Sequence, residues 1–110
     1  LQGMEIYRDV PILYSLGNFT FGTEGNFGKL SNPIWHHGWI ADILIEGGRA
    51  VQVDLIPIAT DNRVVAFQPR LSDPHLLPEM LELVNAPFGT SMSLQGHRAR
   101  WLLHEPDPNL

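Results

Sequence analysis

The fold is decided by the stretch from Trp39 to Ile58, which reads WIADILIEGGRAVQVDLIPI. Two apolar runs, Trp39–Glu46 and Arg49–Ile58, flank the pair Gly47-Gly48. A Gly-Gly pair supplies the positive φ angles that a two-residue hairpin turn requires. The stretch therefore predicts an antiparallel hairpin that turns at these two glycines.

A two-residue turn also fixes which residues of the two runs face each other. The expected cross-strand pairs are Glu46 with Arg49, Leu44 with Val51, and Asp42 with Val53. Alternation then predicts one face with Trp39, Ala41, Ile43 and Ile45, and another with Ile40, Leu44, Val51, Val53 and Leu55. Because both faces carry apolar residues, we expect a sheet that is covered on both sides.

Before this hairpin, the sequence predicts a second hairpin and a long loop. The arms Met4–Tyr7 and Pro11–Leu16 are rich in β-branched and aromatic residues, and they flank a turn at Arg8-Asp9. Pro11 is expected to begin its strand, because proline cannot donate to a ladder. Glycine and asparagine are so frequent between Gly17 and Gly38 that no regular element is expected there.

After the central hairpin, the sequence predicts a short strand at Val64–Phe67, one helix and a last strand at Arg98–Leu103. The helix is expected between Asp73 and Ala86 and to begin properly at Pro78. A stripe at helical spacing, expected in the core, consists of Leu77, Met80, Leu81 and Val84.

Composition limits the function classes. The chain has 110 residues, is 44% hydrophobic and only 17% charged, which favours one folded domain over disorder. Twelve acidic against seven basic residues give a net charge of −5, which argues against binding to nucleic acid. No cysteine is present, so thiolate chemistry is excluded. No apolar run approaches the ~20 residues that a membrane span needs.

Three groups of residues are candidates for chemistry. The neighbours His36 and His37 could bind one metal ion only from a loop, and the alternative is that they cover a sheet edge. Asp42 and Asp54 lie within apolar strands, where burial would raise a carboxyl pKa and suit a general acid; the alternative is that they mark edges or solvated positions. A third group follows the arm that ends at Leu16.

In this third group, Ser15 and Asn18 flank the end of a strand, a place where α/β proteins gather ligands. The alternative for Asn18, which follows Gly17, is a turn residue with a left-handed backbone.

Three segments resemble one known family. They are Gly3–Tyr7 with Pro11–Phe19 and Phe21, then Gly38–Ile58, and then Ala86–Thr90. The stretch YSLGNF from Tyr14 to Phe19 carries the most specific signal. On these residues the chain resembles the poly-γ-glutamate capsule-biosynthesis family, the CapA-type bacterial proteins with a calcineurin-like metallophosphoesterase fold.

The resemblance implies that the family's metal-binding residues come before Leu1, so we expect the chain to be an excerpt whose N-terminal part is its main partner. Divalent metal ions would be cofactors of the intact protein, and this chain alone would bind none. The strand end with Ser15 and Asn18 would lie near the metal site. The family often has an aspartate where Gly22 stands, and the pair His36-His37, which could form a substrate loop, is outside its pattern.

The expected fold is an α+β excerpt of an α/β sandwich, with mostly antiparallel hairpins and one C-terminal helix. Residues 1–104 would form the C-terminal portion of the metallophosphoesterase-like domain, and 105–110 a tail. The function implied by the resemblance is capsule biosynthesis or metal-dependent phosphoester hydrolysis at the bacterial cell envelope, with the isolated chain inactive. The alternative is a non-catalytic β-rich interaction module that pairs through an exposed sheet edge, as a homo-oligomer for instance, at Leu1–Tyr7.

Overall fold

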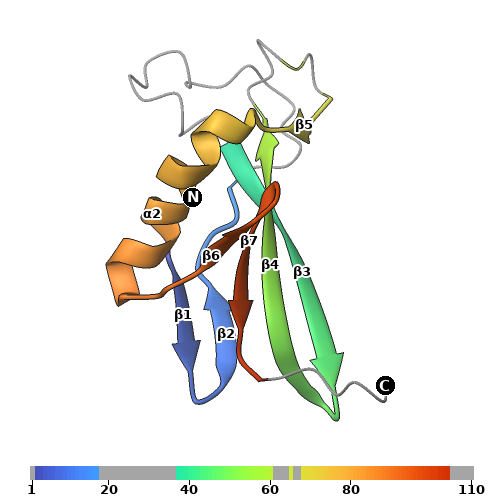
Figure 1. Cartoon of the computed structure of the whole chain (residues 1–110), viewed down its shortest axis with the longest axis vertical. Coiled ribbons are helices and arrows are strands. Elements are labelled where there is room, and N and C mark those ends of the chain that lie inside the picture. Colours follow the sequence, from blue (N-terminus) through green and yellow to red (C-terminus); the bar gives the residue numbers. More distant parts are fainter. Residues whose placement is uncertain (1, 18–36, 61–64, 66–67, 105–110) are drawn as a thin grey trace.

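A computed structural model describes residues 2–17, 37–60, 65 and 68–104. Its elements, in chain order, are β1 (Met4–Tyr7), β2 (Val10–Leu13), β3 (His37–Glu46), β4 (Arg49–Ala59), β5 (Arg70–Leu71), η3 (Pro74–Leu76), α2 (Leu77–Asn85), η4 (Ala86–Phe88), β6 (Ser93–Gln95) and β7 (Arg98–Leu102). Strands β1 and β2 form one antiparallel sheet, and the other five form a second sheet in the order β3-β4-β7-β6, with β5 also paired to β4 (Figure 1). The α+β class, the antiparallel hairpins and the C-terminal helix are confirmed.

Both predicted hairpins are present, and each turns through two residues with positive φ. Gly47 and Gly48 have φ angles of 59° and 77°, while Arg8 and Asp9 have 50° and 63°. Two consecutive residues in this region make the turn that matches the right-handed twist of the strands. Pro11 is the second residue of β2, opposite Ile6, rather than its first.

The register of the central hairpin differs from the predicted one because of a β-bulge. Glu46 faces Arg49 and Ile45 faces Ala50, as the turn requires, but Leu44 then faces Gln52. The extra residue on β4 moves every later pair by one position. The observed pairs include Ile43 with Val53, Ala41 with Leu55, and Asp42 with Asp54.

The bulge also corrects the predicted faces. Val53 and Leu55 share a face with Trp39 and Ala41, not with Ile40 and Leu44, because one inserted residue reverses the alternation. We call this the inner face. The opposite side of the five-stranded sheet, with Ile40 and Leu44, is the outer face.

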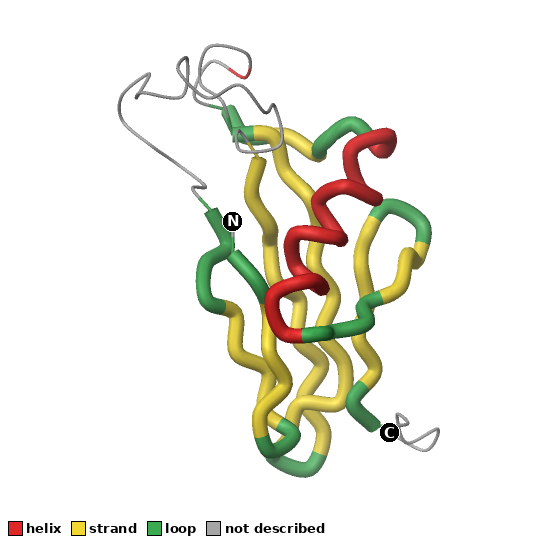
Figure 2. Tube along the Cα trace, turned by 90° about the vertical axis from the view of Figure 1, so that its left-hand side faces the viewer, coloured by secondary structure: helices red, strands yellow, loops and turns green. Residues whose placement is uncertain are grey.

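The inner face is covered by α2, which lies across the strands in Figure 2. Asp73 caps η3 by accepting the backbone N–H of His75, and α2 begins at Leu77, one residue before the predicted start. The predicted apolar stripe is confirmed as core. Leu77, Met80 and Val84 are buried and Leu81 is partly buried, all in one cluster with Val53, Leu55 and Ala99.

The β1–β2 hairpin joins the same core. Met4 is fully buried in the cluster, and its carbonyl accepts a hydrogen bond from the buried Thr90 hydroxyl after α2. Next to it, a Cβ at Gly3 would lie 3.0 Å from the Pro87 ring, so the close approach of η4 needs a glycine there. The hairpin and the helix therefore pack as one layer on the inner face.

The outer face is not covered by any element within the described ranges, contrary to the expectation of a sheet buried on both sides. Ile40, Leu44 and Leu102 on this face are 40%, 41% and 48% exposed. The strands β5 and β6 were not predicted, since each has only two or three residues. Most of the predicted strand Val64–Phe67, the loop residues 18–36 and the tail 105–110 lie outside the described residues, whereas Val65 is buried.

Candidate functional site

The structure places the end of the first hairpin beside the start of β3. The carbonyl of Leu16 accepts a hydrogen bond of 2.7 Å from the backbone N–H of Trp39. Ser15 is the neighbour of Leu16, and His37 lies two residues before Trp39. Two of the predicted candidates are thus brought to one end of the sheet by segments more than twenty residues apart in sequence.

Ser15 closes a local turn at this end. Its hydroxyl oxygen accepts the N–H of Gly17 at 3.3 Å, and its carbonyl accepts the N–H of Gln2 at 3.2 Å. A serine that bonds to the backbone two residues later is a common way to bend a chain at the end of a strand. Asn18 and His36, the other candidates, lie outside the described residues.

His37 forms a side-chain hydrogen bond to Ser72. The Nδ1 atom of His37 and the Oγ atom of Ser72 are 2.8 Å apart, and Ser72 is only 8% exposed. The backbone N–H of Ser72 donates to the carbonyl of Pro57, which fixes the serine against the end of β4. Ser72 was not recognised from the sequence, because a lone serine 35 positions from a histidine carries no local signal.

A cavity of about 220 Å³ lies in front of Ser72, with Pro57, Leu71, Pro74 and His97 as its other walls. The lining is mainly apolar, with one hydroxyl and one imidazole. A serine bonded to a histidine is the first part of an activated nucleophile. The Ser72 N–H is already bonded, however, so it does not provide the oxyanion donor that acyl transfer needs.

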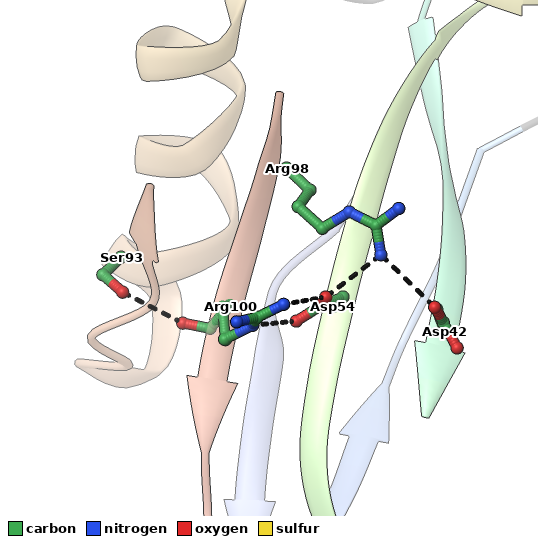
Figure 3. Close-up of polar contacts among 5 residues, drawn as sticks. All are labelled: Asp42, Asp54, Ser93, Arg98 and Arg100. Atoms are coloured by element: carbon green, nitrogen blue, oxygen red, sulfur yellow. Dashed lines mark hydrogen bonds and ion pairs between the residues drawn. The ribbon is translucent and has the colours of Figure 1, made fainter. Parts of the chain in front are cut away.

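Two aspartates and two arginines form a polar arrangement on the outer face, drawn in Figure 3. The carboxylate of Asp54 accepts hydrogen bonds from Nε and Nη2 of Arg100, at 2.8 and 2.9 Å, and from Nη1 of Arg98 at 3.1 Å. The same Nη1 of Arg98 lies 3.3 Å from Asp42. We call these four residues the outer-face ion cluster.

Asp54 is the buried centre of this cluster. Its side chain is 2% exposed, against 63% for Asp42. Hydrogen bonds from Arg100 lower the pKa of Asp54 below its ordinary value of 3.8, with a further contribution from Arg98, although burial acts in the opposite direction. The pKa of this buried carboxyl is therefore lowered, not raised as burial alone would make it. The alternative of a solvated position is right for Asp42 and wrong for Asp54.

Asp54 is therefore not suited to act as a general acid near neutral pH, because a carboxylate with a lowered pKa has no proton to give. Arg98 and Arg100 were not recognised from the sequence. The available signal was their spacing of two along a predicted strand, which puts both side chains on one face. Their partner strand, however, is known only from the tertiary pairing of Asp54 with Arg100.

Metal-ligating side chains do not gather in the described residues: no group of three or more His, Cys, Asp or Glu residues could hold an ion there. In those ranges, too, no helix is both long and apolar enough to cross a membrane. The sequence matches no protein-family model and no curated protein.

Proposed function

We propose that this chain is the C-terminal, sheet-completing part of a CapA-like protein, and that the intact protein acts in poly-γ-glutamate capsule biosynthesis or in metal-dependent phosphoester hydrolysis. The observation that supports the proposal is the one-sided packing of the five-stranded sheet. Over β4 and β7 the inner face is buried under α2 and the β1–β2 hairpin, with Val53, Leu55 and Ala99 fully buried. The outer face is half-exposed at Ile40, Leu44 and Leu102.

The outer face carries exposed apolar residues of the kind that pack against a second layer of protein. A sheet normally buries its apolar face against another element, and sandwiches place a second sheet there. Ile40, Leu44 and Leu102 would supply apolar contacts to such a layer. The outer-face ion cluster lies among them and holds Asp54 without an uncompensated charge.

In this proposal the strand end with Ser15 supports a metal site that the preceding part of the protein supplies. Such a site needs oxygen and imidazole ligands that hold two ions ~4 Å apart and activate a water molecule. The chain itself would contribute Asn18 near the site and, from the start of β3, His37 near the substrate. The isolated chain would bind no metal and would be inactive.

A hydrolysis assay tests the catalytic part of the proposal. The intact protein with manganese or another divalent ion should hydrolyse an aryl phosphate, and Asn18→Ala should lower kcat by about a hundredfold if Asn18 contacts the site. Asp9→Asn, in the turn at the far end of the β1–β2 hairpin, is the control and should keep full activity, because asparagine tolerates the positive φ of this position. Absence of turnover in the intact protein would contradict the hydrolase function and leave capsule biosynthesis to be tested by polymer production.

The structural part has its own test. The upstream portion and this chain, expressed as separate pieces, should copurify, and Leu44→Glu on the outer face should abolish the complex. Tyr7→Glu, at a residue 52% exposed in the other sheet, should leave it intact. A complex that survives Leu44→Glu would show that the outer face is not the surface completed by the rest of the protein.

A further inference from the structure

Strand β3 lies at one edge of the five-stranded sheet (Figure 1). It has ten residues, and within the described chain its only strand partner is β4. On the side of β3 that faces away from β4, the described backbone supplies one hydrogen bond, from the N–H of Trp39 to the carbonyl of Leu16. A long edge strand with unpaired N–H and C=O groups is a template for a further strand.

The orientation of this backbone follows from two observations. The N–H of Trp39 points away from β4, since it is donated to Leu16, and the residue opposite Trp39 is Pro57, which has no N–H to exchange. Along an antiparallel strand, successive residues direct their N–H and C=O groups to opposite sides. Ala41, Ile43 and Ile45 therefore direct these backbone groups away from β4, as Trp39 does.

The turn at the C-terminal end of β3 indicates the same backbone orientation. In a hairpin with a two-residue turn, the residues next to the turn form a hydrogen-bonded pair. Glu46 and Arg49 are that pair, so Glu46 directs its backbone groups toward β4 and Ile45 directs its own outward. The bulge lies on β4 and does not alter the alternation along β3.

The side chains along this edge are those of an interface rather than of a protected edge. Ile40, Ile43, Leu44 and Ile45 are 40%, 39%, 41% and 64% exposed. Natural edge strands are commonly blocked by charged side chains, above all lysine, or by proline. Neither lysine nor proline occurs from Ile40 to Glu46, and the charged residues there are Asp42 and Glu46.

We propose that β3 pairs antiparallel with β3 of a second copy of this chain, about a two-fold axis at Ile43, so that the two five-stranded sheets become continuous. The pairs across the interface would be Ile43 with Ile43, Ala41 with Ile45, Asp42 with Leu44, and Ile40 with Glu46. All three outward backbone positions then find partners, and each acidic side chain lies opposite an apolar one. This pairing is independent of the function proposed above.

Charge and geometry select this register among the alternatives. An axis at Asp42 would place two carboxylates directly opposite each other, and an axis at Leu44 would place Asp42 opposite Glu46; both are destabilising. An axis at Ala41 would place Ile43 opposite Trp39, whose N–H is already bonded. An axis at Ile45 would place Ile43 opposite Gly47, which is in the turn.

The first test uses proline at the axis. Ile43→Pro removes an N–H that points away from β4, so the β3–β4 ladder can remain, but two intermolecular hydrogen bonds are lost. We expect a concentration-dependent dimer for the unaltered chain in sedimentation velocity and at least about tenfold weaker association for Ile43→Pro. Ile43→Val is the control and should dimerise normally. Far-ultraviolet circular dichroism establishes that each variant is folded, and Ile43→Lys, which places two charges at the axis, replaces the proline variant if that one unfolds.

The second test measures the register by disulfide cross-linking. Because the chain has no cysteine of its own, only the introduced cysteines can form a disulfide. Ile43→Cys should oxidise to a covalent dimer, since residues at the axis are within disulfide range. Asp42→Cys mixed with Leu44→Cys should give the mixed dimer in preference to either homodimer. A chain that stays monomeric at every concentration, or one that dimerises without these cross-links, overturns the proposal; in the first case the edge is left to a strand of another protein or of the intact parent.

Discussion

The neighbouring strands β3 and β4 have similar sequences and very different surroundings. Residues Val51, Val53 and Leu55 of β4 are 2%, 0% and 0% exposed, whereas Ile45 of β3 is 64% exposed. Strand β4 pairs on both sides, with β3 and with β7, and its inner face lies under the core cluster. Strand β3 has a neighbour on one side only among the described elements.

The difference shows that apolar composition predicts a strand but not its role. The same types of aliphatic residue stabilise the fold in β4 and, among the described elements, form an edge without a further strand in β3. What differs is position in the sheet, because a central strand gains contacts from two neighbours and an edge strand from one. Substitutions placed in the two strands should therefore have unequal effects.

The largest difference is expected between matched truncations. Leu55→Ala should lower the free energy of unfolding by about 3 kcal/mol, because it leaves a cavity in the core cluster. Ile45→Ala should lower it by less than about 1 kcal/mol, since that side chain is mostly exposed. Urea denaturation at low protein concentration measures both, and equal losses would mean that β3 is as buried as β4.

The next difference concerns the two aspartates that face each other across β3 and β4. Asp54→Asn should cost about 2 kcal/mol at neutral pH, because two arginines lose a buried anionic partner. Asp42→Asn, at a residue whose side chain is 63% exposed, should cost about 0.5 kcal/mol or less. Urea denaturation at pH 7 measures both losses, and an equal cost at the two positions would contradict the central place of Asp54 in the cluster.

The dependence on pH separates these two carboxylates further. The pKa of Asp54 in the folded state is below 3.8, so as the pH falls the unfolded chain binds the proton first. The stability due to Asp54 is thus complete above about pH 4 and is lost as the pH falls through the lower, folded-state pKa. Between pH 6 and pH 2, the free energy of unfolding should therefore change less with pH for Asp54→Asn than for the unaltered chain. An equal pH dependence of the two free energies of unfolding would contradict the stabilising role of the ionised Asp54 in the ion cluster.

The smallest effect is expected in the turn that joins the two strands. Gly48 has a φ of 77°, and no atom lies within 4 Å of the place that a Cβ would take, so only the backbone conformation opposes a side chain. Gly48→Ala should cost about 1 kcal/mol, and Gly48→Asn less, because asparagine tolerates a left-handed backbone. Thermal unfolding ranks the stability of the unaltered chain and the two variants. Equal melting temperatures for Gly48→Ala and Gly48→Asn would contradict this prediction.

Local chemistry made much of the fold predictable. The two-residue turns at Arg8-Asp9 and Gly47-Gly48 lie between apolar runs, and Asp73 with the prolines that follow marks the start of the helical region. Each of these signals acts within a few residues, which is why the hairpins and the helix could be located from the sequence.

The candidate site was predictable only in part. The strand end at Ser15 and the start of β3 at His37 were recognised separately, but their proximity depends on the contact between Leu16 and Trp39. Ser72 and the outer-face ion cluster were missed or misjudged, because their members come from separate segments of the chain. The lowered pKa of Asp54 illustrates this: its apolar neighbours are visible in the sequence, but only the pairing of β4 with β7 brings Arg100 to it.

The amino-acid sequence alone determined the class of the fold, its two clear hairpins and its single amphipathic helix, because turn conformation and apolar periodicity are local properties of the chain. The tertiary structure decided the bulge in β4, the assignment of residues to the inner and outer faces, and the ion cluster. These depend on which strands lie side by side, and that choice is made by packing between distant segments, where one extra residue reverses a whole face.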